Sequence, residues 1–121
     1  MKFEDGHTVG IDLGTSYSAI ARLDDDGEPV ILENSQGRPI TPSILILGDD
    51  GRVVVGPSPE LVAEEAPERV VLGIKRHMGD NKFELYHEGR RLTPELISSM
   101  ILTKLRQDAE EQIKPIRNAV I

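Results

Sequence analysis

The chain has 121 residues, a formal net charge of −7 at pH 7, 38% hydrophobic residues and no cysteine. This length corresponds to one domain, or part of one, and is sufficient to bury a core. The negative charge argues against nonspecific binding of nucleic acid, which depends on a basic surface, and the lack of cysteine excludes disulfides and thiol chemistry.

No apolar run in the sequence reaches the length that a membrane span needs. Near the N-terminus, the acidic residues Glu4 and Asp5 stand where the apolar region of a signal peptide would begin. We therefore expect a cytoplasmic protein that has neither a membrane nor a nucleic acid as its partner.

The first clear pattern is a strand followed by a tight turn. Apolar and other residues alternate over residues 8–13, the period of two typical of a strand. Within it, Asp12 is a carboxylate that is costly to bury unless it is paired or lies near a cation. Gly14 allows the backbone to approach a ligand, and Thr15 and Ser16 add amide and hydroxyl donors. A nucleoside-triphosphate site needs donors that cradle phosphate and a carboxylate that holds Mg²⁺, although an ordinary hairpin turn explains the same residues.

The middle of the chain predicts short strands joined by turns and loops. Strands are expected over residues 17–23, 30–32, 44–47 and 52–56, with an acidic turn at 24–27 and a loop at 33–43. Ser58, Pro59 and Glu60 have the cap, proline and acid that open a helix, which should end near Pro67. The apolar stretch 70–78 carries Lys75, which by pattern alone is a surface charge.

The last third of the chain predicts a small hairpin, a long helix and a final strand. The hairpin should turn at residues 88–89, and Thr93 should cap the helix. One apolar stripe follows the helical spacing at Ile97, Met100, Ile101, Leu105 and Ala109. Residues 107–112 are expected to be the solvated end of this helix, and a strand should begin near Asn118.

Residues 10–18, Gly-Ile-Asp-Leu-Gly-Thr-Ser-Tyr-Ser, resemble the first phosphate motif of the heat-shock protein 70 (DnaK-type) chaperones. Sugar kinases and actins share looser forms of this motif. Further stretches are similar to the chaperone family and follow its order: residues 32–38 with 41–43, residues 73–79, which match the segment of the catalytic lysine, and residues 119–121. Because these stretches span nearly the whole chain, the resemblance is specific.

The resemblance implies an α/β fold of the actin-like ATPase (ribonuclease H-like) class. Residues 1–121 would be the N-terminal part of a truncated nucleotide-binding domain, with the first lobe only, a mixed sheet with helices. The implied activity is ATP hydrolysis with Mg²⁺, in a chaperone that binds and releases unfolded polypeptides. The implied partners are a J-domain co-chaperone and a nucleotide-exchange factor.

The family motifs, carried over residue by residue, assign roles to individual side chains. Asp12 would sit near the Mg²⁺, through the waters of the metal. Lys75 would be the catalytic residue, which reaches the γ-phosphate and positions the attacking water. The β- and γ-phosphates would be wrapped by Gly14, Thr15, Ser16 and Tyr17.

The sequence also departs from typical members of this family. Ser16 stands where the family more often has threonine, and residues 79–92 form a shorter stretch than in typical bacterial members. The rest of the family's nucleotide site would lie beyond Ile121, so we expect the chain alone to be inactive. We also expect it to self-associate, through the edge of its first strand or through an exposed part of the helix stripe.

Two other classes of function are compatible with a phosphate turn. A sugar or carboxylate kinase would direct a carboxylate base at a hydroxyl substrate in place of water, but residues 41–43 and 74–76 match the chaperone family instead. A non-catalytic scaffold that keeps only the fold would bind no nucleotide. Phosphate release from ATP without an added acceptor, in the full-length protein, distinguishes the ATPase from the kinase, and failure to bind nucleotide would favour the scaffold.

Overall fold

The computed structural model of the protein describes residues 2–3 and 6–121, and for Lys2 and Phe3 it describes the backbone alone. Met1, Glu4 and Asp5 lie outside these residues, and so does the acidic N-terminus considered above. Among the described residues, none of the helices has the length and apolar character needed to cross a membrane.

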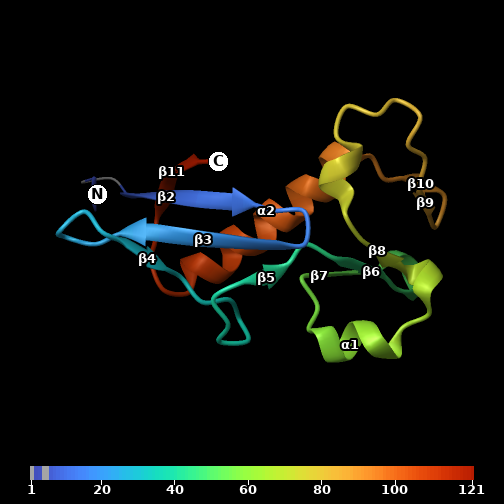
Figure 1. Cartoon of the computed structure of the whole chain (residues 1–121), viewed down its shortest axis with the longest axis horizontal. Helices are drawn as coiled ribbons and strands as arrows, with labels where there is room; N and C mark the ends of the chain where they lie inside the picture. The colour runs from blue at the N-terminus through green and yellow to red at the C-terminus, as the bar shows by residue number, and fades with distance from the viewer. Residues whose placement is uncertain (1, 4–5) are drawn as a thin grey trace.

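The main sheet is built on a long antiparallel hairpin of β2 (Gly6–Leu13) and β3 (Tyr17–Leu23), as the sequence predicts (Figure 1). Four shorter strands complete it: β1 (Lys2–Phe3) and β11 (Ile116–Val120) beside β2, and β4 (Pro29–Ile31) and β5 (Thr41–Pro42) beside β3. The strand expected near Asn118 is confirmed as β11, which runs parallel to β2 with Ala119 opposite Val9. The β5 strand lies within the segment that the sequence predicts as loop.

A second sheet, a small two-stranded hairpin and the short helices lie toward one end of the β2–β3 hairpin (Figure 1). In the second sheet, β6 (Leu45–Leu47) pairs with β7 (Val53–Val55) and β8 (Val70–Val71). The expected small hairpin is formed by β9 (Tyr86–His87) and β10 (Arg90–Arg91). Helix α1 (Pro59–Glu64) has Ser58 as its cap. Three short 3₁₀ helices lie next to strands of the second sheet: η1 (Asp49–Gly51) between β6 and β7, η2 (Pro67–Arg69) before β8, and η3 (Ile74–His77) after β8.

Helix α2 (Pro94–Glu110) covers one face of the main sheet with the predicted apolar stripe. Its N-terminus is capped by the hydroxyl of Thr93, which accepts a hydrogen bond from the Leu96 N–H at 3.1 Å. The stripe packs in one core cluster with the inner faces of both sheets. The stripe residues in that cluster are Ile97, Ile101, Leu105 and Ala109, each at most 2% exposed.

This packing contradicts the expectation that the stripe of α2 is exposed and provides a surface for self-association. The stripe was expected to leave apolar side chains exposed, but Ile97 and Ile101 are fully buried and Leu105 is almost so. The described part of the chain supplies enough apolar surface from β2, β3 and β6 to cover the stripe. Only Met100 is half-buried, at the margin of the cluster.

The C-terminal end of α2 also differs from its expected solvated character. Asp108 is only 7% exposed, and the ammonium of Lys104 donates to its Oδ1 at 3.0 Å. The same ammonium donates to the hydroxyl of Ser35 at 2.8 Å, and the Gln112 amide donates to the Glu33 carbonyl at 2.7 Å. The loop after β4 therefore lies against this end of the helix, which is why Asp108 is buried.

We predict that Lys104→Met lowers the free energy of unfolding by about 2 kcal/mol, because Asp108 would stay buried without its cation. Arg106→Met is the matched control, since it removes a more exposed pair with Glu110 on the same helix. That control should cost less than about 1 kcal/mol. Denaturant unfolding followed by circular dichroism measures both, and equal losses would contradict a structural role for the Lys104–Asp108 pair.

Candidate functional site

The turn between β2 and β3 is so tight that its first residue has no space for a side chain. A Cβ atom on Gly14 would overlap the carbonyl oxygen of Tyr17. By contrast, a Cβ on Gly10, in the middle of β2, would meet open space. Besides allowing the close approach of a ligand, as the sequence suggests, Gly14 is therefore required by the geometry of the turn itself.

The turn presents hydrogen-bond donors that the rest of the protein leaves unused. Thr15 is half-buried and Ser16 is exposed. In the described part of the chain, neither residue donates a hydrogen bond from its N–H or its hydroxyl. The Ser16 carbonyl, in contrast, accepts a hydrogen bond from the Ser43 N–H at 2.9 Å. Unpaired donors gathered on one fixed turn are suited to an oxyanion such as a phosphate group.

Asp12 occupies the second-last position of β2, on the face of the strand that points away from the core. It lies opposite Ala19 of β3, and its side chain is exposed. Its place in an apolar strand suggests a carboxylate whose burial must be compensated, but the Asp12 side chain is exposed, and a carboxylate in water needs no compensation. Across residues 2–3 and 6–121, no three His, Cys, Asp or Glu residues are grouped closely enough to hold a metal ion. Asp12 therefore offers a single carboxylate beside the turn.

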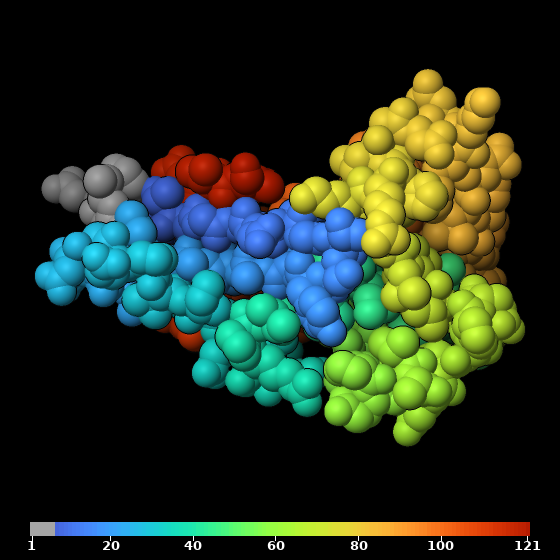
Figure 2. Space-filling view, viewed as in Figure 1, coloured from blue at the N-terminus to red at the C-terminus, as the bar shows by residue number. Residues whose placement is uncertain are grey.

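A cleft of about 330 Å³ separates the turn from the segment before and within η3. One wall consists of Thr15, Ser16 and Tyr17, and the opposite wall of residues 72–73 and Arg76, with residues 43–44 between them. Figure 2 shows the blue turn beside the yellow segment that contains residues 72–76. Two stretches far apart in the sequence thus meet at one cleft.

The structure places Lys75 next to this cleft but not among the residues that line it. Side chains three residues apart lie above one another in a 3₁₀ helix. Accordingly, Gly73 and Arg76 both line the cleft, while Ile74 is buried in the core. The side chain of Lys75 is exposed and makes no hydrogen bond or ion pair with the residues that the structure describes. The cation of the cleft wall, Arg76, was missed by the sequence argument, although a period of three from Gly73 would have indicated it.

Some of the site residues predicted from the sequence line the cleft, and others do not. The structure gathers Thr15, Ser16 and Tyr17 in one wall of the cleft. Gly14 shapes the same turn without lining the cleft. Asp12 and Lys75 are exposed residues near its two walls.

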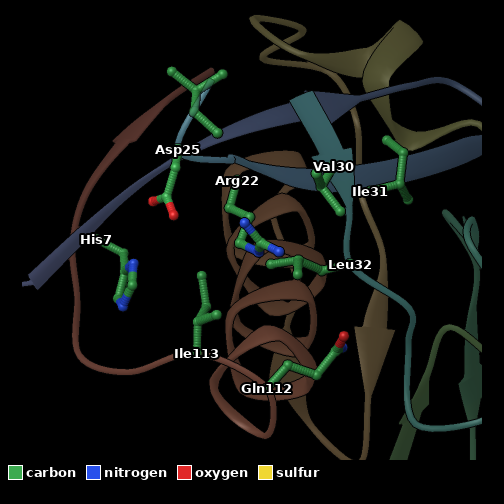
Figure 3. Close-up of a pocket in the computed structure, with 9 residues that line it drawn as sticks. His7, Arg22, Asp25, Val30, Ile31, Leu32, Gln112 and Ile113 are labelled. Carbon is green, nitrogen blue, oxygen red and sulfur yellow. The ribbon is translucent and has the colours of Figure 1, made fainter. Parts of the chain in front are cut away.

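Another hollow, of about 340 Å³, lies at the opposite end of the β2–β3 hairpin (Figure 3). The charged or polar side chains around it include His7 at the start of β2, Arg22 in β3 and Asp25 in the following turn. None of the residues that line it belongs to the turn at residues 14–17 or to η3. This hollow is therefore separate from the candidate phosphate site.

We predict that Gly14→Ala lowers the free energy of unfolding by about 1 to 3 kcal/mol, because the added methyl forces the turn away from the Tyr17 carbonyl. Gly10→Ala, in the strand that precedes the turn and with open space around it, should change this free energy by about 0.5 kcal/mol or less. Denaturant titrations compare the two. A Gly14→Ala protein as stable as the Gly10→Ala protein would show that the turn is less constrained than its geometry indicates.

A comparison with protein families agrees with the geometry. The family model described as Hsp70 protein matches residues 8–84. This region contains the turn, the loop after β4, the cleft and Lys75, and it covers more than half of the chain. The resemblance inferred from the sequence is confirmed by this match: the chain belongs to the Hsp70 family.

Proposed function

We propose that this chain forms the phosphate-binding part of the ATPase of an Hsp70-type chaperone, in the first lobe of an actin-like fold. The observation that carries this proposal is the set of unused donors on Thr15 and Ser16, facing a cleft whose other wall holds the cation Arg76. Donors and a cation on opposite sides of one cleft match the charge and the hydrogen-bonding needs of a polyphosphate. The family match supports a chaperone of this type.

In this proposal the turn holds the β- and γ-phosphates of ATP. Gly14 keeps the turn tight, and the N–H and hydroxyl groups of Thr15, Ser16 and Tyr17 bind the phosphate oxygens. Asp12 is exposed beside the turn, so its carboxylate is available to hold a hydrated Mg²⁺ through the metal's waters. A bound Mg²⁺ would neutralise part of the phosphate charge.

Lys75 supplies the positive charge that the reaction needs most in its transition state. Its long side chain is exposed and unpaired among the described residues, so the ammonium is free to reach toward the cleft. Phosphoryl transfer is catalysed mainly by positioning and by charge stabilisation. In this proposal Lys75 therefore acts on the γ-phosphate and on the attacking water, while Arg76 adds charge to the wall.

The biological role that follows is ATP-driven binding and release of unfolded polypeptides in the cytoplasm. The family resemblance supports a J-domain co-chaperone and a nucleotide-exchange factor as partners. Peptide binding would require regions other than the turn and cleft described here. The proposal for this chain is therefore limited to the nucleotide chemistry.

We predict that Lys75→Ala in the full-length protein abolishes ATP hydrolysis and leaves ATP binding within about threefold of wild type. A charge used mainly in the transition state contributes to the rate and little to ground-state affinity. Single-turnover hydrolysis without added acceptor, beside a calorimetric titration, measures both properties. Lys82→Ala is the matched control, because Lys82 is an exposed lysine in the turn that follows η3 and does not line the cleft. Normal hydrolysis by the Lys75 variant would refute its catalytic role.

We predict that Asp12→Asn shifts the Mg²⁺ dependence of hydrolysis to higher metal concentration. The amide has the shape of the carboxylate but lacks the charge that orders a hydrated metal. The measurement is the hydrolysis rate as a function of Mg²⁺ at saturating ATP. Asp26→Asn, an exposed acid at the other end of the hairpin, should leave the curve unchanged. Superimposable curves for Asp12→Asn and wild type would rule out the metal role.

A further inference from the structure

The turn is held from the side by residues 41–43, through both main-chain and side-chain contacts. Strand β5 pairs with the start of β3, with Tyr17 opposite Pro42 and Ser18 opposite Thr41. One residue further on, the Ser43 N–H donates to the Ser16 carbonyl at 2.9 Å. Every residue from 16 to 18 therefore has a direct partner in this segment.

A buried hydrogen bond between two serine hydroxyls also joins β3 to this segment. The Oγ atoms of Ser18 and Ser43 are 2.8 Å apart, and the two residues are 1% and 2% exposed. Each hydroxyl is the other's only side-chain partner within the described residues. A buried hydroxyl without a partner is costly. The pair therefore keeps β3 and the segment at residues 41–43 at a fixed separation.

The segment that holds the turn is itself fixed. The side-chain amide of Asn34 donates to the Thr41 hydroxyl at 3.2 Å and to the Ile40 carbonyl at 3.1 Å. The N–H of Gly56 donates to the Ile44 carbonyl at 2.9 Å, and a Cβ on Gly56 would stand only 2.6 Å from the Thr41 side chain. Residues 41–44 therefore cannot move freely, and their contacts with residues 16–18 fix the position of the turn.

We propose that Ser43 and Ser18 are positioning residues for phosphate binding. Ser43 fixes the Ser16 carbonyl with its N–H, and the Ser18–Ser43 hydroxyl pair sets where β3 leaves the turn. Both hydroxyls are buried and bonded to each other, so their role is to hold the turn and not to donate to the phosphates. Together they orient the free donors of Thr15 and Ser16 into the cleft before a phosphate arrives, which removes a cost of ordering from the binding step. This inference rests on the proposed ATP site.

The test compares Ser18→Ala, Ser43→Ala and the double variant in the full-length protein. Each single variant leaves one buried hydroxyl unpaired and should lower the melting temperature. The double variant removes both hydroxyls and should recover much of that loss, because no unpaired polar group remains. A purely structural role predicts that nucleotide binding recovers along with stability.

A positioning role predicts that binding does not recover. In the double variant, kcat/KM for ATP should fall by roughly ten- to a hundredfold, the scale of effect of a small misplacement in a site. The ratio of ATP affinity to ADP affinity should fall as well, because the turn acts on the phosphates and not on the nucleoside. Calorimetry with both nucleotides and steady-state hydrolysis measure these quantities. Ser99→Ala, a serine on the outer face of α2, is the control and should change none of them.

The outcomes separate this inference from the proposed function. If the double variant regains stability, kcat/KM and the ATP-to-ADP ratio together, the two serines are structural and the inference is wrong. If the wild-type protein itself fails to bind ATP, the proposed function is wrong and the inference falls with it. Lost binding in a double variant of near wild-type stability supports the positioning role.

Discussion

Helix α2 covers the apolar face of the β2–β3 hairpin, and the other elements take their positions from that contact. A two-stranded hairpin alone is only marginally stable in water. Here Val9 and Ile20 are buried in the same cluster as Ile101 of the helix, and Leu45 of the second sheet joins them. Because both sheets share this one core, the turn at the end of the hairpin has a fixed place relative to η3 across the cleft.

The same helix also holds the loop after β4 by a hydrogen bond. Lys104 reaches from α2 to Ser35 in the loop after β4, and Asn34 of that loop holds Thr41. Two residues after Thr41, the Ser43 N–H donates to the Ser16 carbonyl of the turn. Hydrogen bonds and short stretches of chain thus connect the helix to the turn.

Local patterns in the sequence predicted most elements because their causes are local. The alternation over β2, the caps at Ser58 and Thr93 and the stripe of α2 depend on neighbouring residues alone. The burial of Asp108 and the pairing of Ser18 with Ser43 depend on segments that meet only after folding, 25 positions apart in the serine pair. The proposed role of Lys75 came from family resemblance, since pattern alone treats an exposed lysine as a surface charge. The pattern already indicated Asp12 as a carboxylate beside a phosphate-binding turn, with an ordinary hairpin turn as the alternative.

The site combines fixed donors with free charges, and desolvation explains that division. Amide and hydroxyl groups gain from being held in place, because an ordered phosphate then needs no rearrangement of the turn. Charged groups are different, since burying an unpaired carboxylate or ammonium is costly in the absence of a ligand. Asp12 and Lys75 remain in water beside the cleft, so neither destabilises the empty site. In the proposed site their contribution would arise only when a charged ligand is present, and the rigid turn would then determine where that ligand lies.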